Sequence, residues 1–142
     1  MSALTVRCAR AALIYLALGI ALGVSFALDR ALGAALRPLH AELNLWGWVT
    51  LLIYGMGYHM LPRFAGRPLR SQRLADAQSW LAIAGVALAA LGWAASAAGL
   101  AEALALRALG GGLQLAAALL FAILIGDLLA PRRGLEGRRP SK

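Results

Sequence analysis

The 142-residue chain is 61% hydrophobic and only 14% charged, whereas a soluble domain is about 45–50% apolar and about 25% charged. This balance indicates a single-domain membrane protein. It argues against a secreted disulfide scaffold, a disordered tail or an all-β barrel, and the apolar excess is mostly Ala and Leu, which favour helix. The only cysteine, Cys8, cannot form a disulfide within the chain.

A membrane-spanning helix needs about 20 mainly apolar residues, and four stretches of the chain meet this requirement. These stretches are residues 11–28, 41–61, 80–100 and 108–130. We therefore expect an all-α, integral membrane four-helix bundle over residues 1–130, followed by a basic, flexible cytoplasmic tail over 131–142. The first stretch exceeds the apolar core of a signal peptide, about 7–15 residues, so it is interpreted as an uncleaved span.

Local signals give expected ends and contacts for these helices. Pro62 and Pro68 are expected to end the second helix, because proline interrupts helical hydrogen bonding. Asp76 or Ser79 is expected to cap the third helix. The three glycines of Gly110–Gly112 predict a close approach to a neighbouring helix.

The basic residues predict an orientation in the membrane. Eleven of them lie before the first span, between the second and third, or after the fourth, and only three lie in the other two connections. Because cytoplasmic segments are enriched in Lys and Arg, both termini are expected to be cytoplasmic, in the cell inner membrane. The charge then orients the chain and contacts anionic lipid, so nucleic acid is not an expected partner.

The second span has the residues best suited to bind a cofactor. It holds both histidines of the chain, two of its four tryptophans and two of its three tyrosines. His40 is expected at the non-cytoplasmic start of the helix, with Asn44 and Trp48 on the same face, and Gly47 would let a flat ligand lie close. Neutral imidazole is a common haem ligand. The alternative is an interfacial histidine in contact with water.

His59 is expected at the cytoplasmic end of the same helix. It follows His40 by 19 residues, which corresponds to a rise of about 28 Å, whereas two ligands of one iron lie about 4 Å apart. One chain therefore cannot clamp one haem between both histidines, and a bis-His site needs a second chain. His59 is either a metal ligand at a separate site or an interfacial side chain beside Tyr58.

Three other polar residues are expected to be structural. Glu42 suits the positive end of a helix dipole, and Gln114 is interpreted as a contact between helices. Asp127 is expected to form a surface pair near Arg132 and Arg133, with a proton path as the alternative interpretation.

The second span also carries a family resemblance. The segments R-P-L-H-A-x-x-N-L, G-W and Y-G-x-G-Y-H-x-L-P-R-F resemble the second helix of subunit I of haem–copper oxidases and nitric-oxide reductases. In that family a histidine at the start of this helix binds the low-spin haem, and a proline ends the helix. His40 and Pro62, 22 residues apart, match that spacing, and Ser79-Trp80-Leu81 resembles the start of the next helix. The specific part spans His40 to Leu81.

The resemblance implies a non-covalent haem b bound through His40, for electron transfer or for binding of a diatomic gas such as NO or O2, with a respiratory redox partner. It does not imply oxygen reduction by this chain alone, because the copper ligands and the high-spin haem ligand have no counterpart. No C-x-x-C-H motif is present, so c-type attachment is excluded. The alternative is a cofactor-free accessory or assembly protein of a respiratory complex.

The resemblance also bears on the oligomeric state. The family subunit consists of three four-helix arcs, so three copies of this chain would correspond to one subunit. A bis-His haem between two chains would instead favour a dimer. A homo-oligomer is expected in either case, with the trimer favoured.

Overall fold

The computed structural model describes residues 2–130, which form helices and no strands. The chain runs through α1 (Ala3–Leu28), α2 (Arg30–Ala41), the π-helix η1 (Glu42–Thr50), α3 (Leu51–Ala65), α4 (Gln72–Ala97) and α5 (Ala103–Leu129). Because α2, η1 and α3 follow one another without a break, they form one long rod, called the second rod below. The all-α four-helix architecture predicted from the sequence is confirmed for the described residues.

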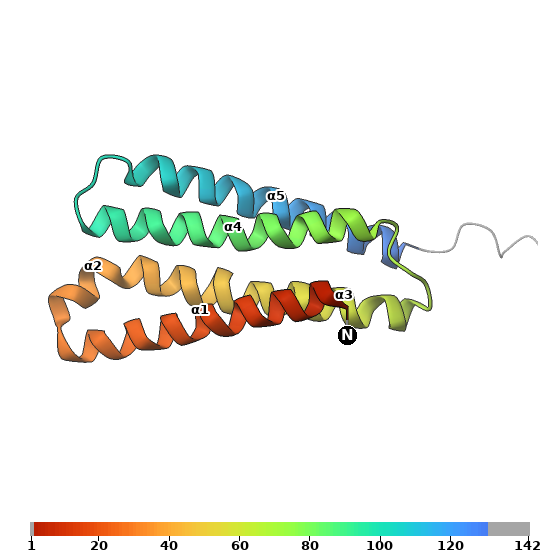
Figure 1. Cartoon of the computed structure of the whole chain (residues 1–142), viewed down its shortest axis with the longest axis horizontal. Coiled ribbons are helices and arrows are strands. Elements are labelled where there is room, and N and C mark those ends of the chain that lie inside the picture. Colours follow the sequence, from red (N-terminus) through yellow and green to blue (C-terminus); the bar gives the residue numbers. More distant parts are fainter. Residues whose placement is uncertain (1, 131–142) are drawn as a thin grey trace, which may run out of the picture.

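The four rods pack as two hairpins (Figure 1). In one hairpin α1 lies beside the second rod, and in the other α4 lies beside α5 along most of its length. The start of α1, the link between α3 and α4 and the end of α5 all lie at one end of the molecule. This end is called the basic end below, because the arginines of the α3–α4 link lie there.

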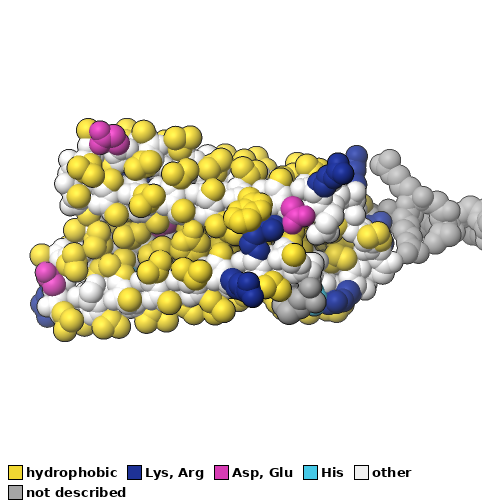
Figure 2. Space-filling view, in the orientation of Figure 1, with side chains coloured by type: hydrophobic (Ala, Val, Ile, Leu, Met, Phe, Trp, Pro, Cys, Tyr) yellow, Lys and Arg dark blue, Asp and Glu magenta, His cyan; other side chains and the backbone are white. Residues whose placement is uncertain are grey.

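Three of the rods are long and apolar enough to cross a membrane. They are α1, α4 and α5. Large apolar side chains remain exposed along them, among them Ile14 of α1 and Ile123 of α5. Figure 2 shows hydrophobic side chains over most of the visible face, with Lys and Arg gathered toward one end. The expected span 41–61 falls on η1 and α3, which continue a helix that already began at Arg30.

Two helices begin earlier than their hydropathy predicts, because serines cap them. The side chain of Ser2 accepts a hydrogen bond from the amide of Thr5, so α1 starts at Ala3 rather than near residue 11. Ser71 caps α4 in the same way through the amide of Leu74. The expectation that Asp76 or Ser79 caps this helix was wrong.

Asp76 and Ser79 instead bind Arg7 and join the two hairpins near the basic end. The guanidinium of Arg7 lies 2.8 Å from the carboxylate of Asp76 and donates to the hydroxyl of Ser79. It also lies 4.8 Å from the ring centre of Trp80, a distance suited to a cation–π contact. The start of α1 is thereby held against the first turns of α4.

The second rod ends at a glycine and not at a proline. Pro62 lies within the last turn of α3, and Gly66 ends the helix with a φ of 61°, in the left-handed region that glycine adopts without strain. The expectation was therefore wrong for Pro62, whereas Pro68 lies beyond the end of the helix, as expected. The guanidinium of Arg67 then donates to the main-chain carbonyls at the end of α5, among them those of Leu128 and Ala130, each at 2.7 Å.

The pairing of α4 and α5 depends on one of the three consecutive glycines. A Cβ at Gly110 would lie 2.4 Å from the backbone nitrogen of Ala89, so the two backbones are in contact there. Nothing lies within 4 Å of such an atom at Gly111 or Gly112. The predicted close approach is thus confirmed at Gly110, whereas the next two glycines face away from the other described helices.

Candidate functional site

The second rod begins well before His40. Asp29 caps it by accepting hydrogen bonds from the amides of Ala31 and Leu32, at 2.8 and 3.1 Å. His40 therefore lies near the end of α2, inside a continuous rod, and the expectation that it starts the helix was wrong. Hydropathy did not identify α2 as part of this helix, because the segment contains the charged residues Arg30 and Arg37.

A π-helix begins two residues after His40 and runs from Glu42 to Thr50. Wide helical turns of this kind are rare and are frequent at functional sites. Two of its side chains donate hydrogen bonds to main-chain carbonyls. The amide of Asn44 donates to the oxygen of His40, and the hydroxyl of Thr50, the last residue of η1, donates to the oxygen of Leu45, each at 2.8 Å. These bonds help to satisfy backbone groups where the helical register changes.

The imidazole of His40 lies against α1. Its Nδ1 is 2.9 Å from the carbonyl oxygen of Gly19, so Nδ1 carries the proton and donates it. A Cβ at Gly23 would lie 2.8 Å from Cε1 of the ring, and the ring of Phe26 is centred 5.5 Å away. The pattern Gly19-x-x-x-Gly23, which is typical of close helix contacts in membranes, is a sequence signal that could have indicated these neighbours.

Only one other predicted site residue lies with His40. Asn44 is on the same side of the rod and contacts Gly19 as well as the backbone of His40. Gly47 lies against the side chain of Tyr15 of α1, where a Cβ would be 2.6 Å from Tyr15 Cβ. Trp48 packs on the middle of the core, beside the cluster that contains Leu51 and Ala82. In this single chain Gly47 therefore allows α1 to approach the rod.

His59 lies far from His40, in α3 near the basic end. Its Nε2 is hydrogen-bonded to the guanidinium of Arg63, one turn later. Among residues 2–130, no group of three or more His, Cys, Asp or Glu side chains is placed to hold a metal ion. Any metal bound through His40 or His59 would therefore need ligands from a cofactor or from another chain.

An apolar groove runs beside the first part of the second rod. It has a volume of about 480 Å³ and is lined by leucines and alanines of α1, the second rod and α4, together with Tyr15. Leu39 and Leu43, the neighbours of His40 and Asn44 in sequence, line it, whereas His40 itself faces α1. The groove is therefore adjacent to His40 but does not contain it.

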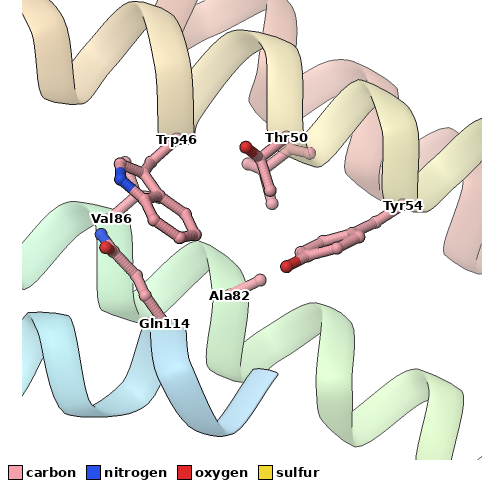
Figure 3. A pocket seen from close by; sticks show the side chains of 7 residues that line it. Trp46, Thr50, Tyr54, Ala82, Val86 and Gln114 are labelled. Atoms are coloured by element: carbon pink, nitrogen blue, oxygen red, sulfur yellow. The ribbon is translucent and has the colours of Figure 1, made fainter. Parts of the chain in front are cut away.

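Two polar side chains meet between the hairpins. Gln114 of α5 donates a hydrogen bond to the carboxylate of Glu42, the first residue of η1. The expected role of Gln114 as a contact between helices is confirmed. Figure 3 shows the adjoining space between Trp46, Tyr54, Ala82 and Gln114, which is too small to admit a water-sized sphere.

Asp127 forms a surface pair, although with a different partner from the expected one. Its carboxylate lies 3.6 Å from the guanidinium of Arg70, and both side chains are exposed. The expected partners Arg132 and Arg133 lie outside the described residues, as does the whole tail 131–142.

The class of protein is thus an all-α membrane bundle with a histidine at the entrance to a π-helix. Residues 3–136 match the family model described as cytochrome c and quinol oxidase polypeptide I, and the chain belongs to this family. The resemblance found in the second span is thereby confirmed over nearly the whole chain. No curated protein and no solved structure matches the chain.

Haem is the cofactor of this family, and the hydrogen bond made by Nδ1 of His40 is of the kind that a metal-ligating histidine makes. A metal-ligating histidine donates one ring N–H to a carbonyl or carboxylate, which fixes its tautomer and orientation. In this chain Nδ1 donates to the carbonyl of Gly19, so Nε2 carries a lone pair. Nε2 of His40 therefore has the lone pair that a haem ligand needs.

Proposed function

We propose that this chain is a b-type haem protein of the cytoplasmic membrane, with His40 as an axial ligand. The observation that carries the proposal is the 2.9 Å hydrogen bond from Nδ1 of His40 to the carbonyl of Gly19, which leaves the lone pair of the ring on Nε2 for a metal. Bound haem would supply a one-electron couple or, with an open axial position, a site for NO or O2. The chain would serve electron transfer or gas binding, not complete oxygen reduction.

The protein residues have separate tasks in this proposal. Gly19 and Gly23 leave room for the imidazole, and the carbonyl of Gly19 keeps its tautomer. Asn44 holds the backbone of His40 at the start of the π-helix. The groove next to Leu39 and Leu43 gives the neighbourhood of His40 an apolar surface.

A homo-oligomer belongs to the same proposal. His40 and His59 lie 19 residues apart on one rod, much farther than the about 4 Å between two ligands of one iron, so a bis-His iron needs a histidine from a second chain. Three copies would restore the number of helices in the family subunit and could each hold a five-coordinate haem. Two copies could share one bis-His haem, and a respiratory redox partner would then exchange electrons with it.

A cofactor-free accessory protein of a respiratory complex is the second candidate. The packing of Tyr15 against Gly47 favours it, because this contact closes the surface that was expected to face a flat ligand. In that case His40 and Asn44 would serve only to hold α1 against the second rod.

A visible spectrum of the protein purified from haem-replete cells decides between the two. We expect Soret and α bands that shift on reduction with dithionite, and a colourless preparation would contradict haem binding. His40→Ala should lose these bands while the protein still inserts. His59→Ala should affect the same bands less, because His59 lies at the other end of the rod; equal losses would point to a second haem.

A further inference from the structure

Glu42 is a carboxylate in the apolar part of the bundle. Only 9% of its surface is exposed, and it lies two residues after His40, at the first position of η1. Burial of such a group is costly unless it is hydrogen-bonded. The side-chain amide of Gln114 donates a hydrogen bond to this carboxylate, and the indole of Trp93 in α4 also lies within reach of it. The bond to Gln114 therefore helps to hold the start of η1 against the other hairpin.

Gln114 is itself held firmly. It is 6% exposed, and its side chain passes across Gly85 of α4, where a Cβ would lie 3.0 Å from Gln114 Cγ. Any larger residue at position 85 would close this passage. The space beside Gln114 in Figure 3 admits no water-sized sphere. The bond to Glu42 therefore forms in a dry, close-packed part of the bundle, where a hydrogen bond is strong.

His40 and Glu42 face different neighbours. Two residues correspond to about 200° around an α-helix. The side chain of His40 accordingly contacts its own hairpin, and the side chain of Glu42 contacts the other hairpin. His40 lies against Gly19 and Gly23 of α1, whereas Glu42 is bound from α5. The first turn of η1 is thus held on both sides. Loss of the contact on the α5 side would release the start of η1 from the other hairpin, two residues away from the imidazole of His40.

We propose that Gln114 and Glu42 are positioning residues for His40: their hydrogen bond holds the start of η1 in place and thereby sets the direction of the imidazole two residues earlier. This inference deepens the proposed haem function and rests on it for its functional meaning. The mechanical part, the effect of Gln114 on the ring of His40, concerns the protein alone.

The test compares two buried glutamines. Gln114→Leu removes the donor to Glu42. Gln78→Leu is the matched control, because Gln78 is also fully buried and donates to a carbonyl, that of Ala117 in α5, but binds no residue of the second rod. Glu42→Gln is the conservative variant, since its amide oxygen still accepts from Gln114. If Gln114→Leu fails to insert, Gln114→Asn, one methylene shorter, replaces it.

Two readouts are taken on each variant. The first is the ¹⁵N resonance of Nδ1 in histidine-labelled protein, with His40 assigned by comparison with His59→Gln. The second is haem affinity together with the electron paramagnetic resonance spectrum of the oxidised haem. We expect Gln114→Leu to shift the His40 resonance and to lower haem affinity by about tenfold, the lower end of the loss when a direct hydrogen-bond partner of a ligating residue is removed, because Gln114 acts on His40 through Glu42. Gln78→Leu and Glu42→Gln should leave both readouts as in the unmodified protein.

The outcomes separate the two proposals. A His40 resonance that is unchanged in Gln114→Leu, or equally shifted in Gln78→Leu, overturns the positioning role. An unmodified protein without haem bands overturns the proposed function, and the ¹⁵N resonance still decides whether Gln114 orients the ring.

Discussion

Gly23 of α1 lies directly against the imidazole of His40: a methyl group at this glycine would be 2.8 Å from Cε1 of the ring. The space that the histidine needs is therefore provided by a glycine 17 residues earlier in the chain. This relationship makes α1 part of the candidate site, although α1 contains none of the residues that the sequence indicated for it.

Gly23→Ala is expected to displace the ring of His40 and to break its hydrogen bond with Gly19. Overpacking of this kind costs about 1–3 kcal/mol, and the ligand would lose its orientation. The measurements are the thermal unfolding temperature and the haem content of the purified protein, both of which should fall. Gly111→Ala is the control, because nothing lies within 4 Å of the added atom, and it should change neither. Equal behaviour of the two variants would contradict the close contact.

The sequence was sufficient for the number of rods, because each apolar stretch is long enough to span a membrane and is separated from the next by polar residues. It was not sufficient for the ends of the helices. Three rods begin before their apolar parts, because polar side chains cap them: Ser2, Asp29 and Ser71. A hydropathy profile does not detect such caps. His40 was consequently placed at a helix start, although a full helical segment precedes it.

The environment of the site was less predictable for a physical reason. Asn44 could be assigned to His40, because residues four apart share a face of one helix. Gly19 and Gln114 lie on other helices, and their contacts with His40 and Glu42 depend on how the rods pack. The π-helix was not predicted either, since the local sequence gives no strong signal for a register change between Glu42 and Thr50.

Arg67 is expected to stabilise the basic end of the bundle. Its guanidinium donates to main-chain carbonyls at the end of α5, and such charge-assisted bonds are worth about 1.5–3 kcal/mol where they are buried. Because Arg67 is half-buried, we expect Arg67→Ala to lower the free energy of unfolding by about 1–2 kcal/mol. Arg67→Lys should restore little of it, since an ammonium lacks the planar fork.

Arg70→Ala is the matched control for Arg67. Arg70 lies in the same link and pairs with Asp127, but both side chains of that pair are well exposed, and exposed pairs contribute about 0–1 kcal/mol. Unfolding temperature in a single detergent compares the variants. A loss in Arg70→Ala as large as that in Arg67→Ala would show that net charge in the link, rather than the contact with α5, stabilises this end.

The orientation in the membrane stays a prediction. The structure places the start of α1, the α3–α4 link and the end of α5 on one side, and six of the nine arginines within residues 2–130 belong to these segments. Since basic segments remain cytoplasmic, green fluorescent protein fused after Lys142 should fluoresce. Alkaline phosphatase at the same position should be inactive, and an active phosphatase fusion would reverse the assigned orientation.

The oligomeric state and the number of haems per chain should be linked. A trimer can bind one haem per chain, with one histidine ligand on each iron and an open position for a gas. A dimer can bind one haem per two chains, with His40 of each chain on opposite faces of the ring. Native mass spectrometry from a mild detergent gives both numbers, and the optical spectrum gives the coordination of the iron.

We expect a trimer with three haems and a five-coordinate spectrum. A dimer with one haem and a six-coordinate spectrum would instead support electron transfer. A monomer with a bis-His spectrum would contradict the argument, because the two histidines of one chain are separated by 19 residues of the same rod.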